Sequence, residues 1–137
     1  MPAPILPSTL SLFRLALNRA SQLEPRVLVF GQWPPNEDSR DVPYLVIDPD
    51  PGWDQVDRGD GRVSSRRGRF HVRACGSSTE QAALALDAAR DVFLDWRPYV
   101  DLRFGMAREA EADGLTIDRS VPTSPRFVFG LTYEIDD

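Results

Sequence analysis

The sequence predicts an α+β fold: one mixed or antiparallel sheet of five to six strands with two helices packed on one face, in the order α-β-β-β-α-β-β-β. Three observations predict it. Residues 70–96 pass from a strand-like alternation through a Gly-Ser-Ser turn into an alanine-rich helix. A second apolar pattern at helical spacing lies near the N-terminus, and in residues 126–135 every second side chain is large and apolar.

The length and composition are those of one globular domain, spanning residues 1–137. A chain of 137 residues with a net charge of −5 is unlike a protein that coats nucleic acid, whose affinity comes from neutralising phosphates. All sixteen basic residues are arginine, as expected from a GC-rich coding bias. Cys75 is the only cysteine, so no internal disulfide is expected, and neither a signal peptide nor a membrane span is predicted.

The first helix is expected from Ser8 or Thr9, either of which can cap it, to about Leu23. Pro25 then ends it. Its apolar stripe recurs at helical spacing and comprises Leu10, Leu12, Phe13, Ala16, Leu17, Ala20 and Leu23.

Two short apolar runs, 27–30 and 44–47, are predicted as strands separated by a polar, turn-rich segment. Neither run alternates, which indicates strands that are buried on both faces or central in the sheet.

Residues 48–69 are predicted to form a long charged loop, or a hairpin with a frayed tip. The charge of this segment changes sign along its length. Aspartates come first and arginines second: Asp48, Asp50, Asp54, Asp57 and Asp60, then Arg62, Arg66, Arg67 and Arg69.

The strand at 69–75 leads into the second helix, for which Ser77 and Glu80 have the spacing of a capping box. One face of this helix gathers small and aromatic side chains, which suit close packing on a sheet: Ala85, Ala88, Ala89, Val92, Phe93 and Trp96. Pro98 ends the helix.

The rest of the chain is predicted to be β. Residues 100–107 alternate as a strand, Asp113-Gly114 is a turn signal, and a short strand follows at 115–118. The last strand, 126–135, has a second face that is half apolar, which suits partial burial in an assembly.

No catalytic, cofactor or metal site is predicted. His71 lies mid-strand, and although it shares a face with Cys75, four residues of strand separate them by about 13 Å, too far for a dyad. The aspartates of residues 48–60 do not have the spacing of a calcium-binding loop.

The chain resembles the tail-terminator (tail-completion, minor tail) proteins of long-tailed bacteriophages. The resemblance rests on Trp33-Pro34-Pro35 before the YLVID strand, the Asp/Gly-rich loop, and the strand FHVRACG. It extends through the helix, with Gln81-Ala82-Ala83-Leu84, Asp87 and its FLDW end, to the closing segment DRSVPTSPRFVFGLTYEI.

This resemblance implies a non-enzymatic virion protein, assembled in the host cytoplasm, that forms a hexameric ring at the head-proximal end of the tail. Its partners would be further copies of itself, the tail-tube protein and the head–tail connector or neck protein. DNA would pass through the lumen without specific binding, and no cofactor or membrane would be involved. The net acidity would serve either solubility or a lumen that repels phosphate.

A ring closes through two different patches on each subunit, and we expect the charged segment and the outward aromatics to supply them. The interface candidates are Trp33, Trp53, Asp54, Asp57, Asp60, Arg62, Arg66, Arg67, Arg126 and Val128.

Other interpretations remain open. A neck or head-completion connector would share the size and the acidity. A small ligand-binding or toxin–antitoxin-type α+β domain would need a concave pocket with converging polar groups. A hydrolase would have to use Cys75.

Overall fold

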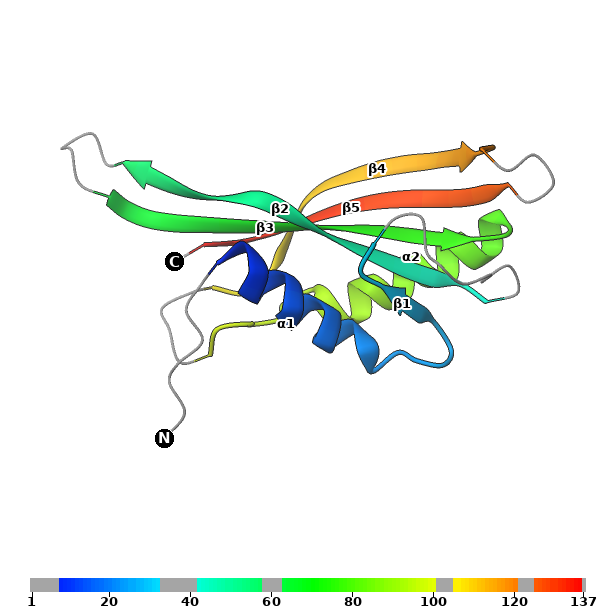
Figure 1. Ribbon diagram of the computed structural model, residues 1–137, viewed down its shortest axis with the longest axis horizontal. Helices are drawn as coiled ribbons and strands as arrows, with labels where there is room; N and C mark the ends of the chain where they lie inside the picture. Colours follow the sequence, from blue (N-terminus) through cyan, green and yellow to red (C-terminus); the bar gives the residue numbers. More distant parts are fainter. Residues whose placement is uncertain (1–7, 33–41, 58–62, 101–104, 121–124, 137) are drawn as a thin grey trace.

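The computed structural model describes residues 8–32, 42–57, 63–100, 105–120 and 125–136, with backbone alone at 51–57 and 63–66. Within these ranges the predicted α+β class is confirmed: two helices cover one face of a five-stranded sheet with strand order β1-β2-β3-β5-β4 (Figure 1). The elements are α1 (Thr9–Ser21), β1 (Leu28–Phe30), β2 (Tyr44–Asp57), β3 (Val63–Gly76), α2 (Thr79–Phe93), β4 (Arg108–Asp118) and β5 (Arg126–Asp136).

The sheet is mixed, because β1 pairs with β2 in parallel and the remaining neighbours pair antiparallel. Two strands follow α2 in the described residues, where three were expected. The turn expected at Asp113-Gly114 is wrong: β4 runs through it and carries a register shift between Asp113 and Thr116. A bulge accommodates the glycine without ending the strand. Of the strand expected at 100–107, residues 101–104 lie outside the description and 105–107 are not strand.

Both helices begin at a serine cap. Ser8 caps α1 as expected, but α1 ends at Ser21, two residues early, and Leu10 of the predicted stripe is exposed. For α2 the expected cap is wrong by one residue: Ser78 accepts from the Gln81 N–H, while the Gln81 amide oxygen accepts from the Ser77 N–H. With Ser78 as the cap, Gln81 is the third residue of the helix, and its side chain bonds the residue before the cap.

The α2 helix ends at Phe93 rather than at Trp96, and Asp95 adopts a left-handed backbone conformation with φ of 63°. The Trp96 ring still reaches the core, with its centroid 5.6 Å from that of Phe93. Alternating residues of β3 and β5 pack under the helices, so Phe70 and Tyr133 are fully buried between the layers. We call this helix-covered side the inner face of the sheet and the opposite side the outer face.

The strand at residues 44–47 is buried on both faces, as predicted, since each of its four side chains is 0% exposed. The same prediction is wrong for β1, which is an edge strand with half-buried side chains. With only three residues, β1 covers β2 as far as Val46. No helix in the described ranges is both long and apolar enough to span a bilayer.

In the described parts of the charged segment, residues 48–57 and 63–69, the chain forms two paired strands, which agrees with the expected hairpin. Residues 58–62, the expected tip, lie outside the described residues. β2 and β3 pair from Tyr44↔Cys75 as far as Asp57↔Val63. β5 accompanies β3 only up to the pair Arg67↔Asp136. Beyond that pair the hairpin continues as two strands alone, past the end of the helical layer (Figure 1). We call this two-stranded part, residues 55–57 and 63–66, the ribbon.

Candidate functional site

The outer face of the sheet carries the polar side chains of the strands. Along β3, Arg67, Arg69, His71 and Arg73 alternate with inner-face residues, and Thr132 and Glu134 lie beside them on β5. Both α1 and α2 lie on the opposite side of the sheet (Figure 1). A partner or ligand can therefore approach these polar groups without displacing either helix.

Glu134 lies at the centre of an arginine cluster. Its side chain is 7% exposed, and its two oxygens lie 3.2 Å from Arg67 Nε, 3.0 Å from Arg69 Nε and 2.6 Å from an Arg108 terminal nitrogen. Burial alone raises the pKa of the Glu134 carboxyl, but the hydrogen bonds from Arg108 and Arg69 and the charge of Arg67 outweigh it, so this pKa is lowered. The cluster joins β3, β5 and β4 at the base of the ribbon.

Replacing Glu134 with glutamine should lower the free energy of unfolding by about 2 kcal/mol near neutral pH, because hydrogen bonds to a charged group are lost. Since the folded-state pKa of Glu134 is lowered, its stabilisation exists above the unfolded-state pKa and is lost as the pH falls through the folded-state value. The difference between wild type and Glu134→Gln should therefore shrink in acid. Urea denaturation at pH 7 and pH 3 measures it, with Glu111→Gln, at an exposed β4 position, as control. An equal difference at both pH values would contradict this role.

His71 and Cys75 do not form a catalytic pair. The His71 ring lies 2.9 Å from Thr132 Oγ1 through Nδ1 and 3.0 Å from Asp50 Oδ2 through Nε2. Cys75 is fully buried, and burial raises the pKa of its thiol to about 12, against the weaker lowering effect of a hydrogen bond with Tyr44. A thiol that stays protonated near neutral pH is a poor nucleophile.

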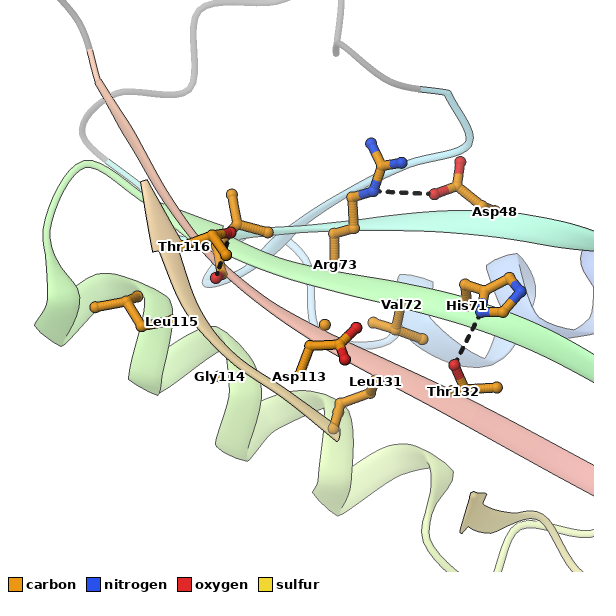
Figure 2. Close-up of a pocket in the computed structure, with 12 residues that line it drawn as sticks. Asp48, His71, Val72, Arg73, Asp113, Gly114, Leu115, Thr116, Leu131 and Thr132 are labelled. Carbon is orange, nitrogen blue, oxygen red and sulfur yellow. Dashed lines mark hydrogen bonds and ion pairs between the residues drawn. The ribbon is translucent and has the colours of Figure 1, made fainter. Parts of the chain in front are cut away.

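A groove of about 720 Å³ runs along the outer face (Figure 2). Its floor is β5, one wall is β3 with His71 and Arg73, and the other wall is the bulged part of β4, from Asp113 to Thr116. Gly130 makes room for that wall: a Cβ there would lie 2.9 Å from Asp113 Oδ2. The bulge in β4 and the missing side chain at Gly130 together shape the groove.

The charges in the groove are partly neutralised within the chain. Arg73 Nε lies 3.4 Å from Asp48 Oδ2, and His71 contacts Asp50 and Thr132. Among the described residues, the Asp113 carboxylate makes no hydrogen bond or ion pair. Figure 2 shows its carboxylate projecting from β4 across β5. In the described ranges no three His, Cys, Asp or Glu side chains are grouped as metal ligands.

A small apolar cluster occupies the outer face near β1. Tyr44, Val46 and Cys75 form it, and Val128 packs against it. The Arg126 guanidinium lies 5.7 Å from the centre of the Tyr44 ring, a separation at which a cation is attracted to the ring face. Two of the sequence-predicted interface residues, Arg126 and Val128, therefore adjoin one outer-face cluster.

The other interface candidates fall into three groups. Trp33, Asp60 and Arg62 lie outside the described residues, whereas Trp53, Asp54, Asp57 and Arg66 are placed by backbone only, in the hairpin. Arg67 contacts Glu134 within its own chain. Sequence reasoning missed Glu134, Arg108 and Asp113. The alternation of β5 did put Glu134 on the outer face, but the arginines around it come from two other strands.

Both long edges of the sheet are poorly suited to adding another strand. β4 carries two register shifts, and most of its charged residues are acidic. The free edge of β2 beyond Val46 contains Pro49, Pro51 and a register shift. Bulges, charges and proline are the devices by which edge strands resist pairing with other chains. A contact with a partner is therefore expected through side chains rather than through an extended sheet.

Of the comparisons with known proteins, the one with solved structures gave matches. No protein-family model matches the chain, and no curated protein matches it. Among solved structures, 22 chains match. One belongs to the virion of a native gene transfer agent particle, with a TM-score of 0.45 and 14% sequence identity over 91% of this chain and 92% of that chain. Since a TM-score below 0.5 does not establish a shared fold, this match assigns no function by itself.

Proposed function

We propose that this protein is a non-enzymatic structural component of a phage-type virion. In this proposal identical copies close into a ring that caps the head-proximal end of a tail tube, ends its polymerisation and offers a docking surface to the head or neck. The sequence resemblance to tail terminators supports the proposal. The observation on which it depends most is the ribbon, which leaves the sheet as two strands alone.

A two-stranded ribbon is at best marginally stable by itself in water. Here it continues the β2–β3 hairpin beyond the last pair with β5 and beyond the helices (Figure 1). Such a projection fits a chain that completes the packing of its ribbon on another subunit. Neither catalysis nor the binding of a small ligand requires a hairpin that extends beyond the sheet in this way.

The arrangement also fits a ring rather than a two-fold dimer. The ribbon and the C-terminal end of β4 lie at opposite ends of the long axis of the molecule (Figure 1). When two unlike patches at opposite ends meet between copies, the contact is head-to-tail, and it closes into a ring when the rotation per copy permits.

Shortening the hairpin tests this proposal. Replacing residues 56–65 with Asn-Gly puts a tight two-residue turn between the paired residues Gln55 and Arg66. We expect the wild-type chain to give a ring in native mass spectrometry and electron microscopy, and the shortened chain to run at its single-chain mass, close to the 15.4 kDa of the full chain. An unchanged circular dichroism spectrum serves as the control for folding.

A strictly monomeric wild-type chain, both alone and mixed with tail tubes, would reject the proposal. An assay of binding to tube ends distinguishes the role of a tail terminator from that of a neck connector, the alternative given in the sequence analysis. Electron microscopy of tubes polymerised with and without the protein should show capped ends and a fixed length only when the protein is present. A neck connector would leave the tube length unchanged.

A further inference from the structure

We propose that the outer-face groove is the receiving half of the ring contact and that its occupant is the ribbon of the next copy. This inference rests on the proposed ring and names the surface through which the ring closes. It follows from three properties of the groove: its position, its charges, and the poor suitability of the sheet edges for pairing.

The position of the groove suits a head-to-tail contact. The β4 wall lies in the second half of that strand, toward the end of the molecule opposite the ribbon (Figure 1). A copy placed end to end with the next therefore brings its ribbon toward this groove. The groove also lies on the face without helices, so a neighbour can approach it without displacing α1 or α2.

The charges of the two surfaces complement each other. The ribbon has an acidic arm on β2, with Asp57 and, at its base, Asp54, and a basic arm on β3, with Arg66. The groove has a basic wall on β3, with Arg73, and an acidic wall on β4, where Asp113 is the charged side chain that lacks an ion pair among the described residues. A ribbon lying along the groove can place its basic arm beside Asp113 and its acidic arm beside the β3 wall.

In this contact, side chains of the ribbon enter the groove, and no strand is added to the sheet. The floor of the groove is lined by the small residues Val128, Gly130 and Thr132, and neither edge of the sheet favours strand addition. The energy of the contact would then come from apolar packing on the floor and from the charged walls, which set its direction and register.

Disulfide trapping tests the contact in the full-length chain. Asp57→Cys on the ribbon and Leu115→Cys in the groove, combined in one chain and treated with copper phenanthroline as oxidant, should give a ladder of linked multiples that ends at the ring size. Leu115 lines the groove and is 39% exposed, whereas the native Cys75 is fully buried and does not compete. The matched control pairs Asp57→Cys with Asp87→Cys, an exposed position on α2, and should give no ladder.

A charge exchange gives an independent readout. Asp113→Arg alone and Arg66→Asp alone should each weaken ring association by about tenfold, and the double variant should recover most of the loss, because the pair is restored with its signs reversed. Asp87→Arg, which makes the same charge change on the helical layer, should leave association unchanged.

Ladder formation and recovery in the double variant would support the contact. A wild-type ring that gives no ladder, or additive losses in the double variant, would overturn this inference while leaving the ring intact. A monomeric wild-type chain would instead reject the proposed function itself, so native mass of the wild type separates the two failures.

Discussion

Phe70→Ala should lower the free energy of unfolding by about 3–5 kcal/mol, the range typical of a buried phenylalanine truncated to alanine. Phe70 is fully buried at the centre of an aromatic cluster on the inner face. Its ring centroid lies 5.0 Å from that of Phe93, 6.0 Å from that of Trp96 and 5.4 Å from that of Tyr133. The substitution therefore removes ring contacts with both α2 and β5.

The space left by the Phe70 ring would remain as a cavity. Its walls belong to the β3–β5 pair and to α2, which cannot easily move toward one another to fill it. β3 and β5 are held by a continuous register from Arg67↔Asp136 to Gly76↔Phe127. A loss of this size is a large part of the about 5–15 kcal/mol that stabilises a typical domain. Phe70→Ala should consequently reduce the yield of folded protein as well as its stability.

Urea denaturation followed by tryptophan fluorescence and circular dichroism measures the loss. Leu84→Ala is the matched control, because Leu84 is an exposed apolar side chain, 61% accessible, on the helix that covers Phe70. It should change the free energy of unfolding by no more than about 0.5 kcal/mol. A Phe70→Ala variant as stable as this control would show that the cluster is not central to the core.

The sequence predicted this core because its signals are local. The alternation around Phe70 and the helical spacing of Ala85, Ala89 and Phe93 each lie within one element, and the structure buries these residues as expected. The same holds for residues 44–47, whose unbroken apolar run predicted burial on both faces.

The predictions that were wrong depended on pairing between distant elements. Asp113-Gly114 is a turn signal in isolation, but register with β5 keeps the chain extended and turns the glycine into part of a bulge. Likewise, the apolar side chains of β1 suggested a central strand, yet only the order of strands in the sheet shows that it lies at an edge.

The outer-face site could be predicted only in part for the same reason. The change of charge sign along 48–69 is a sequence signal, and it is enough to single out the hairpin and its arginines. The arginine cluster, by contrast, exists because Arg69 and Glu134 are cross-strand partners and Arg108 is the partner of Glu134 on the other side. The groove needs the bulge in β4 and the absence of a side chain at Gly130, neither of which has a recognisable sequence motif.

Gly76→Ala should also destabilise the fold strongly, by about 3 kcal/mol, because overpacking against backbone cannot be relieved by a side-chain rotation. A Cβ at Gly76 would lie 2.3 Å from Gln81 Cβ, 2.8 Å from the Ala82 nitrogen and 2.9 Å from the Gln81 carbonyl carbon. These atoms belong to the first turn of α2. The helix would have to move away from β3, or β3 would have to give up its last pairs with β5.

Moving α2 would also disturb the bonds that begin it. The Gln81 N–H donates to Ser78 Oγ at 3.2 Å, and the Gln81 side-chain oxygen accepts from the Ser77 N–H at 3.0 Å. The loss of a helix cap costs about 1 kcal/mol by itself. Gly76→Ala should therefore lower the urea concentration at the unfolding midpoint. It should also reduce the helical circular dichroism signal in the far ultraviolet at urea concentrations close to that midpoint.

Gly114→Ala is the matched control, since a Cβ at Gly114 would meet nothing within 4 Å. Both variants add one methyl group to a glycine of the same sheet, so the difference between their urea midpoints isolates the clash with α2. Equal midpoints would mean that α2 can shift at no cost. The helical layer would then not hold β3, and with it the basic wall of the groove, firmly in the position that the proposed ring contact needs.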